Sequence, residues 1–578
     1  RIQRRLERLY GPDRGDELAR RLSAVVHRFA LPVAHAGPPP PLSERDVVLI
    51  TYGDSVQSSG ERPLVTLKRF CDQRLGDAVS TVHVLPFCPS SSDGGFAVVD
   101  YRQVDERLGS WSDIEAIARD YRLMADLVLN HCSSQSEWFD NYRAGVSPGE
   151  GYFIEVDPEA DLSAVVRPRP WPLLTEVQTS RGKRWVWTTF SADQVDLDWS
   201  APEVLVEFCD ILLGYVTHRV QVLRLDAVAF LFKRLGTCCL HLPETHEVVK
   251  LLRDVLELVA PGVVLLTETN VPHDENVSYF GDGDEAHMVY QFTLAPLLLF
   301  ALLRGDSLPL QRWLRTYGEP PAGGFFLNFT ASHDGVGLRP LEGVVAPADI
   351  AWLVDRVSER GGLVSYRKMP DGTDSPYELN VAYRDALAEP GDDRLGVRRF
   401  ICSQTVAASL KGVPAVYIHS MLGTRNWLEG VERGEKRDIN RRRWQLGQLD
   451  SLLDDPHSSH AVILGALTRM LQTRRQRSAF HPDSRQEVVD SDEQLLGVLR
   501  TAADGDEVLC WFNFGSTPVA LPAEATIERL GVGPWQNLLA SGSSAQVAEQ
   551  TVLSAYESLW LASSGRPGSS GSSGRLES

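Results

Sequence analysis

The chain has 578 residues and a formal net charge of −19, and its 43% hydrophobic and 23% charged residues are the ordinary mixture of a globular protein. This length accommodates one large domain with one or two smaller ones. The acidic balance argues against nucleic acid as a partner, because phosphate backbones are bound by basic patches. The lack of an apolar run of membrane-spanning length argues against a membrane protein.

The first part of the chain, residues 1–45, predicts a helical extension and a linker. Charged residues with helical periodicity run to about residue 36, and a Gly-Pro-Pro-Pro-Pro stretch follows. From there to residue 478, eight short apolar runs alternate with amphipathic helical patterns. Continuous apolar runs suit strands buried on both faces of a parallel sheet, so residues 46–478 predict an α/β fold, a (β/α)8 TIM barrel. The eight runs are residues 47–52, 82–87, 124–129, 220–225, 263–267, 288–292, 325–329 and 415–419.

Two intervals inside the predicted barrel are too long for simple βα loops. Residues 132–195 and 338–390 are therefore expected to be insertions that are functional or form small domains of their own. After residue 478 the pattern changes to short strands with polar turns, which predicts a C-terminal all-β domain over residues 479–562. The Gly- and Ser-rich residues 563–578 predict a disordered tail.

Three acidic residues, Asp226, Glu268 and Asp334, each come at or shortly after the end of a predicted barrel strand. Catalytic groups of such barrels sit at the C-terminal ends of the strands, and a carboxylate there is costly unless it is paired or used. A single Asp in this position is more often a helix N-cap. Three acids at strand ends, with Arg224 and His333 close by in sequence, favour an active site.

A pair of carboxyl groups at strand ends suits retaining cleavage of a glycosidic bond. One carboxylate attacks the anomeric carbon and forms a covalent glycosyl-enzyme, and the other protonates the leaving oxygen and then deprotonates the incoming acceptor. Arg224 lies two residues before Asp226 and hence on the same strand face, where it is expected to keep Asp226 ionised. Glu268 has to be protonated at rest, so its surroundings are expected to raise its pKa.

Four segments resemble the signature regions of the α-amylase clan, glycoside hydrolase family thirteen. In chain order they are Asp126 to His131, Arg224 to Asp226, Glu268, and His333 with Asp334. The resemblance implies that Asp226 is the nucleophile, Glu268 the acid/base and Asp334 a stabiliser of the transition state. The side chains that it implies for holding the glucose ring are His131, Arg224 and His333.

The finer resemblance is to the sucrose phosphorylase-like subfamily. The segments that carry it are residues 93–96 (DGGF), 167–170 (RPRP), 189–198 (TFSADQVDLD), 236–239 (GTCC) and 437–441 (RDINR). It implies that Asp93 and Phe96 bind glucose and that Phe190 and Gln194 lie on the acceptor side. It also implies that glucose is transferred to inorganic phosphate with retention, giving α-glucose 1-phosphate, and that no metal and no organic cofactor takes part.

Two arginines of these segments, Arg169 and Arg437, are candidates for binding phosphate. Each offers a planar fork of donors that matches a phosphate group. Arg437 is also a candidate for binding the glucoside. For each of them, a surface salt bridge is the competing interpretation.

The acceptor region departs from the sucrose phosphorylases, which carry a His two residues after the acid/base Glu. Here Asn270 takes that position, and the acceptor loop reads SPYELN at residues 375–380. Both segments, and the helical extension, resemble the glucosylglycerate phosphorylases of the same subfamily. That resemblance implies reversible phosphorolysis of 2-O-α-glucosylglycerate to glucose 1-phosphate and D-glycerate. Tyr377 and Glu378 are expected to contact the acceptor, with loop packing and a solvated surface as the alternatives.

Three other functions stay open from the sequence. They are a sucrose or sucrose 6-phosphate phosphorylase, an α-glucoside hydrolase, and a non-catalytic binding barrel, against which the three acids argue. The expected partners are small molecules: the glucoside, phosphate and glucose 1-phosphate. The eight cysteines lack zinc-site spacing and favour reduced thiols in the cytoplasm. The oligomeric state is open, with a homodimer as one option.

Overall fold

The computed structural model describes residues 1–36, 39–169, 171–368, 373–540 and 545–563. Its centre is a closed barrel of eight parallel strands in the order β1-β16-β12-β11-β10-β9-β4-β3. The predicted (β/α)8 barrel is therefore confirmed, and each of the eight apolar runs contributes one strand. These strands are β1 (Val48–Thr51), β3 (Thr81–Val84), β4 (Arg122–Val128), β9 (Val220–Asp226), β10 (Val264–Thr267), β11 (Met288–Tyr290), β12 (Phe325–Phe329) and β16 (Val413–Tyr417).

The barrel strands are buried because helices cover their outer face. Four of these helices, α3, α6, α7 and α10, carry Pro at the first or second position, where its missing N–H would have no partner in the helix anyway. The helices that follow the barrel strands include α3 (Pro63–Phe70), α4 (Trp111–Asp120), α6 (Pro202–Thr217), α7 (Pro243–Val259), α8 (His273–Val277), α9 (Leu294–Arg304), α10 (Leu308–Thr316), α13 (Asp393–Ser409) and α17 (Ser459–Arg474).

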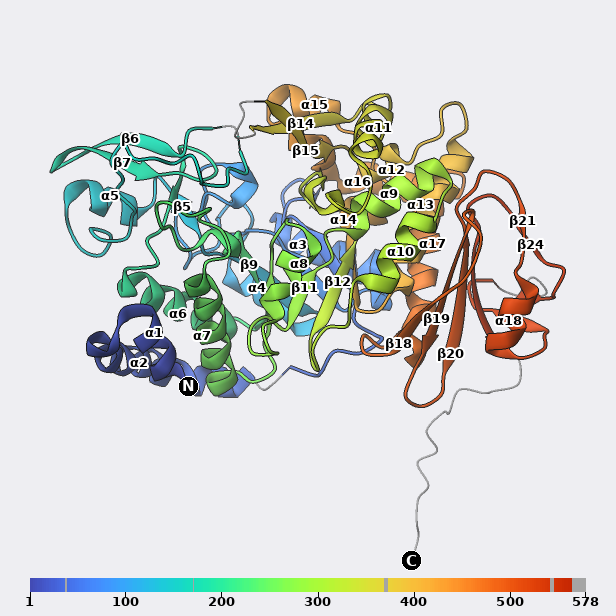
Figure 1. Ribbon diagram of the computed structural model, residues 1–578, viewed down its shortest axis with the longest axis horizontal. Helices are drawn as coiled ribbons and strands as arrows, with labels where there is room; N and C mark the ends of the chain where they lie inside the picture. Colours follow the sequence, from blue (N-terminus) through green and yellow to red (C-terminus); the bar gives the residue numbers. More distant parts are fainter. Residues whose placement is uncertain (37–38, 170, 369–372, 541–544, 564–578) are drawn as a thin grey trace, which may run out of the picture.

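The interval 132–195 extends beyond the end of β4, at the upper left in Figure 1. Its short strand β5 (His131–Ser133) pairs with β8 (Gln194–Asp196), so the two ends of the interval meet. Between them lie helix α5 (Glu137–Ala144) and the hairpin of β6 (Leu174–Thr179) and β7 (Gly182–Trp187). The β5–β8 pair therefore fixes where both ends of the insertion enter the region above the barrel.

The interval 338–390 is built on a three-stranded antiparallel sheet of β13 (Val336–Gly337), β15 (Asp374–Asn380) and β14 (Leu363–Lys368). Helices α11 (Pro347–Ser358) and α12 (Tyr383–Ala386) accompany the sheet. Gly337 is paired with Glu378 across β13 and β15. Because β13 begins two residues after Asp334, this pairing brings the predicted acceptor loop beside the third acid.

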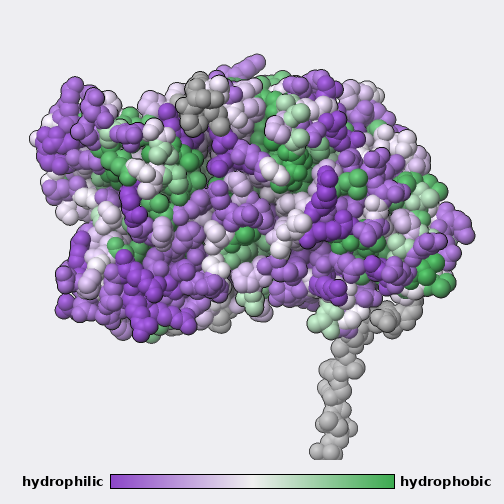
Figure 2. All heavy atoms as spheres, viewed as in Figure 1, coloured by the Kyte–Doolittle hydropathy of each residue, from purple (hydrophilic) through white to green (hydrophobic). Residues whose placement is uncertain are grey.

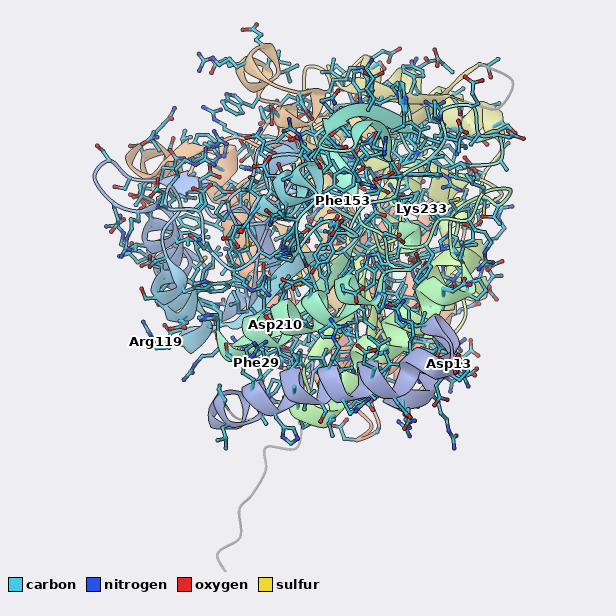
Figure 3. The ribbon with its side chains drawn as sticks, turned by 90° about the vertical axis from the view of Figure 1, so that its left-hand side faces the viewer. Asp13, Phe29, Arg119, Phe153, Asp210 and Lys233 are labelled. Carbon is cyan, nitrogen blue, oxygen red and sulfur yellow. The ribbon has the colours of Figure 1, made fainter. Side chains whose placement is uncertain are left out.

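The N-terminal residues form two helices, α1 (Ile2–Tyr10) and α2 (Pro12–Ala36), that pack on α6 and α7 outside the barrel. Figure 3 shows α2 along the lower edge, with Phe29 close to Asp210 of α6. Hydrophilic residues dominate the surface of this region, at the lower left of Figure 2. Residues 37 and 38 of the predicted linker lie outside the described residues.

The C-terminal region forms a six-stranded sheet in the order β18-β19-β20-β25-β22-β23, at the right of Figure 1. One face of β19 and β20 joins the barrel core, whereas alternate residues of the same strands pack in a second cluster around Trp511. Helix α18 (Ala523–Leu530) accompanies the predicted all-β sheet. The strands are β18 (Arg485–Val489), β19 (Leu495–Thr501), β20 (Glu507–Asn513), β22 (Trp535–Asn537), β23 (Gln546–Val547) and β25 (Ser558–Ser563).

The predicted tail begins one residue too early, because Ser563 is the last residue of β25. Residues 564–578 of that prediction lie outside the described residues. Within the described ranges, none of the helices combines the length and the apolar character that crossing a membrane requires.

Candidate active site

A pocket at the C-terminal ends of the barrel strands brings together the three acids and most of the other predicted site residues. Of the fifteen predicted residues, only Arg224 and Glu378 do not line it; they lie directly behind lining residues. The side chains and backbone that line the pocket belong to Asp93, Phe96, His131, Pro168, Arg169, Phe190, Gln194, Asp226, Ala227, Ala229, Phe230, Glu268, Thr269, Asn270, Val271, His333, Asp334, Arg339, Tyr377 and Arg437.

Asp226 and Glu268 are side by side because their strands are neighbours in register. Leu225 of β9 is paired with Thr267 of β10, and the backbone N–H of Glu268 donates to the Leu225 carbonyl at 3.1 Å. Adjacent strands lie roughly 4.8 Å apart, which suits the short carboxyl separation of a retaining mechanism. The Glu268 Oε2 atom also accepts the backbone N–H of Ala227 at 3.0 Å.

The two carboxyl groups differ in the cation that they contact. Burial raises the pKa of both, and the Arg224 guanidinium opposes that shift. Arg224 Nη1 donates directly to Asp226 Oδ1 at 2.7 Å, whereas none of the described Lys or Arg side chains forms an ion pair with Glu268. A proton shared by the two groups is therefore best placed on Glu268, which leaves Asp226 ionised.

Arg224 is itself held by a buried network behind the pocket. Its Nη1 atom also contacts Asp126 Oδ1 at 2.5 Å, and Asp126 Oδ2 lies 2.7 Å from His83 Nε2. Burial opposes ionisation of Asp126, but Arg224 and His83 together lower its pKa to about 2. The network holds the Arg224 guanidinium in the position from which it contacts Asp226.

Asp334 is held ionised by Arg437, one of the two predicted phosphate-binding residues. Arg437 Nη1 lies 2.6 Å from Asp334 Oδ1, and its Nη2 lies 2.9 Å from Glu378 Oε1. Burial raises the pKa of Asp334, but the charges around it, of which Arg437 is the foremost, together outweigh burial and lower the pKa well below its usual range. Glu378, which we expected against the acceptor, is 2% exposed and accepts the Gly335 N–H at 2.8 Å. Its contacts orient Arg437.

One end of the pocket is a network of Asp93, His131 and Gln194. The Gln194 Nε2 atom lies 2.9 Å from Asp93 Oδ2 and 3.1 Å from His131 Nε2. The Phe190 ring contacts His131, with centroids 5.1 Å apart. Gln194 and Phe190, which we expected on the acceptor side, thus contact the predicted glucose-binding residues.

The same end contains a stacked pair of rings, Phe96 and His333, with centroids 4.9 Å apart. Burial lowers the pKa of His333 to about 3 and also lowers that of His131. Both imidazoles are therefore neutral at physiological pH. A neutral imidazole can donate from one nitrogen and accept at the other, which suits the hydroxyl groups of a sugar.

The backbone at two pocket positions is strained. Asp93 and Ala227 have φ of 51° and 50°, a left-handed conformation that L-residues rarely adopt. Such strain is often stored at functional sites. At Ala227 it accompanies the N–H that donates to Glu268. Gly95 lies two residues after Asp93, and a Cβ there would come within 2.8 Å of the Pro86 carbonyl oxygen, so the DGGF loop requires glycine at this position.

The other end of the pocket is cationic and comprises Arg169, Asn270, Arg339 and Tyr377. Sequence reasoning missed Arg339, because it lies in no segment that we matched to a family motif. The available signal was its position five residues after Asp334, in a stretch with two glycines. Neither Arg169 nor Arg339 forms an ion pair with any residue that the structure describes.

The chain is similar to known proteins along most of its length. The model of the α-amylase catalytic domain matches residues 74–303. The glucosylglycerate phosphorylase of Spirochaeta thermophila is 46% identical over 521 residues, which is 89% of each chain. This chain belongs to the glucosylglycerate phosphorylase family. A sucrose phosphorylase of Agrobacterium vitis is less similar to this chain. The two are 29% identical over 464 residues, which cover 76% of this chain and 89% of the relative.

A solved structure agrees with the barrel fold of the family. The sucrose 6F-phosphate phosphorylase of Thermoanaerobacter thermosaccharolyticum superimposes with a TM-score of 0.71 at 24% identity, covering 81% of this chain and 94% of that one. Among the described residues, no cluster of three or more His, Cys, Asp or Glu side chains could hold a metal ion.

Proposed function

We propose that this chain is a retaining glycoside phosphorylase that transfers glucose from 2-O-α-glucosylglycerate to inorganic phosphate. The products are α-glucose 1-phosphate and D-glycerate. The observation that carries the proposal is the pair of Asp226 and Glu268 at the ends of neighbouring strands, with only Asp226 paired to a cation. The 46% identity to a glucosylglycerate phosphorylase supports glycerate as the acceptor.

In the first half of the reaction, Asp226 attacks the anomeric carbon of the bound glucosyl group. The bond to the glycerate oxygen breaks as Glu268 transfers its proton to that oxygen, and a β-glucosyl ester of Asp226 remains. Asp334, held ionised by Arg437, stabilises the positive charge that develops on the sugar ring. The network of Asp93 and His131 and the ring of Phe96 hold the glucose.

In the second half, phosphate enters where glycerate has left. Glu268, now a carboxylate, takes a proton from phosphate as a phosphate oxygen attacks the anomeric carbon and displaces Asp226. Two inversions at this carbon give net retention. Arg169 supports phosphate binding, because its guanidinium lines the pocket without an ion pair to a described residue, whereas Arg437 is already engaged by Asp334 and Glu378.

No metal ion and no organic cofactor is needed for these steps, since protein carboxyl groups supply both the nucleophile and the acid/base. The eight free cysteines fit the cytoplasmic location that the sequence predicts, because thiols stay reduced there.

The proposed reaction is tested by incubating the enzyme with phosphate and one glucoside at a time, and measuring glucose 1-phosphate. We expect rapid release from 2-O-α-glucosylglycerate and little from sucrose or sucrose 6-phosphate. Faster release from sucrose would replace the acceptor that we propose. Free glucose that forms at the same rate with and without phosphate would identify a hydrolase. If no product forms from any glucoside, the chain is a binding barrel.

A further inference from the structure

The acceptor end of the pocket contains a cation that the proposed mechanism does not use. Three arginines line the pocket, and Arg437 is neutralised by Asp334 and Glu378. The Arg339 side chain has neither an ion pair nor a hydrogen bond to any described residue, and its Nε atom is buried without a partner. A buried donor of this kind is costly and calls for an explanation, such as a ligand that the pocket is built to hold.

Arg339 lies at the end of the pocket where the leaving group emerges. Its neighbour Leu338 donates its N–H to the Tyr377 carbonyl at 2.9 Å. A Cβ on Gly337 would meet the Asn270 amide nitrogen at 2.6 Å, so this backbone lies against Asn270. Asn270 follows Glu268 by two residues, and Glu268 is the group that protonates the leaving oxygen. The glucose-binding network around Asp93 occupies the opposite end.

The electrostatics agree with this placement. Burial raises the pKa of the Tyr377 hydroxyl, and the positive charges of Arg169, Arg437 and Arg339, which line the same pocket, oppose the shift. The acid of this network, Glu378, is already paired with Arg437. The acceptor end therefore carries positive charge that the described residues leave uncompensated, which favours an anionic ligand.

We propose that Arg339 binds the carboxylate of the acceptor and thereby selects glycerate over neutral acceptors. A guanidinium fork matches a carboxylate in a bidentate pair, and the fork of Arg437 is already occupied. This inference rests on the proposed function and identifies the residue that recognises the negative charge of the acceptor. Arg339 would position the leaving glycerate oxygen against Glu268 without taking part in the chemistry.

The test compares two acceptors of nearly equal shape, glycerate and its neutral amide glyceramide, with glucose 1-phosphate as the donor. The quantity measured is the ratio of kcat/KM for glycerate to kcat/KM for glyceramide. We expect a ratio of about 10 to 100 in the wild type, as for a charge-assisted pair. In Arg339→Met the ratio should fall to about 1, and in Arg339→Lys it should be intermediate. The loss should appear mainly as a higher KM for glycerate.

Arg367→Met is the matched control, because Arg367 belongs to the same insertion but pairs with Glu342 outside the pocket lining. It should keep the wild-type ratio. If Arg339→Met also keeps that ratio within about twofold, the proposal for Arg339 is wrong while the proposed function stands. If both acceptors lose equally, Arg339 has only a structural role.

The ratio of kcat/KM for the two acceptors in the wild-type enzyme tests the proposal without any variant. Equal use of glycerate and glyceramide would overturn the role of Arg339. A wild type that transfers glucose to neither acceptor, but releases glucose 1-phosphate from another glucoside, would overturn the proposed function and the inference together.

Discussion

At the scale of single residues, the candidate site depends on which carboxyl group keeps a proton. Asp226 and Glu268 share a buried environment that raises the pKa of each. The direct contact with Arg224 distinguishes them, because Arg224 donates a hydrogen bond to Asp226 and acts on Glu268 through its charge alone. Two acids of opposite protonation state are what a double displacement requires.

Replacing Glu268 by Gln should separate its role as an acid from nucleophilic attack. The variant should lose about 100- to 10,000-fold in kcat/KM with glucosylglycerate, whose leaving oxygen needs a proton. With α-glucosyl fluoride, whose leaving group needs none, it should still form the glucosyl-enzyme, detected by intact mass spectrometry. Asp226→Asn is the matched control and should form no glucosyl-enzyme from either donor. Equal losses of Glu268→Gln on both donors would count against the acid role.

At the scale of elements, the N-terminal helices are attached to the barrel by a buried ion pair. Arg5 of α1 lies 2.6 Å from Asp254 and 3.0 Å from Glu247, both on α7, and Arg5 and Asp254 are 9% and 8% exposed. Arg8, one turn later, reaches the same Glu247 at 3.2 Å, but its side chain is 65% exposed. Arg5 thus makes a buried ion pair between α1 and α7, and Arg8 makes an exposed one between the same two helices.

Arg5→Met should destabilise the attachment of α1 and α2, because Asp254 is left buried without its cation. Removing one partner of a buried pair costs about 3 kcal/mol, whereas an exposed pair contributes about 0.5 kcal/mol. We therefore expect a lower Tm and faster proteolysis near residue 10 in Arg5→Met, and nearly wild-type behaviour in Arg8→Met. Both variants should keep the phosphorolysis rate of the folded enzyme, since neither residue lines the pocket. Equal Tm values for the two variants would contradict the structural role of Arg5.

At the scale of the whole molecule, the barrel, the N-terminal helices and one face of the C-terminal sheet share a single hydrophobic core. Polar contacts join the same parts: Arg500 of β19 and Trp560 of β25 both donate to Ser409 of α13, at 2.8 Å each. Histidines that are buried in the fold stay neutral, whereas the same residues take up protons in the unfolded chain at low pH. The free energy of unfolding therefore depends on pH.

His419 is a buried histidine outside the pocket lining, and it gives a measurable pH dependence. It is 4% exposed, its Nε2 atom is buried without a partner, and burial lowers its pKa to about 3. In the unfolded chain its pKa is near 6.5, so the unfolded state binds the proton more tightly. The stability that neutral His419 provides is therefore complete above pH 6.5 and is lost as the pH falls toward 3.

We expect His419 alone to remove about 2 kcal/mol from the free energy of unfolding between pH 7 and pH 5. His419→Gln cannot take up a proton, so its stability should fall by about 2 kcal/mol less than that of the wild type over this interval. Urea denaturation at both pH values measures the difference. Equal pH dependence in the variant and the wild type would show that His419 is not the group that titrates.

The sequence predicted those parts of the fold that depend on local pattern. Eight apolar runs became the eight barrel strands, because a strand buried on both faces must be apolar along its whole length. Strand order then placed Asp226 beside Glu268, since consecutive βα units put neighbouring strand ends at the same edge. The family motifs identified the same residues by resemblance.

The pairing of the arginines was decided only by the tertiary structure. From the sequence, Arg437 was a candidate for phosphate and Glu378 for the acceptor. In the structure, Glu378 lies in β15 of the three-stranded sheet, and the 3-10 helix of residues 436–440 that carries Arg437 packs against this strand, so that the two side chains form an ion pair. Arg339 carried no motif, yet the same sheet leaves it unpaired in the pocket. Whether a charge is free or compensated depends on partners tens of residues away. Local sequence pattern contains no information on such contacts, because they form only when the insertion folds against the barrel.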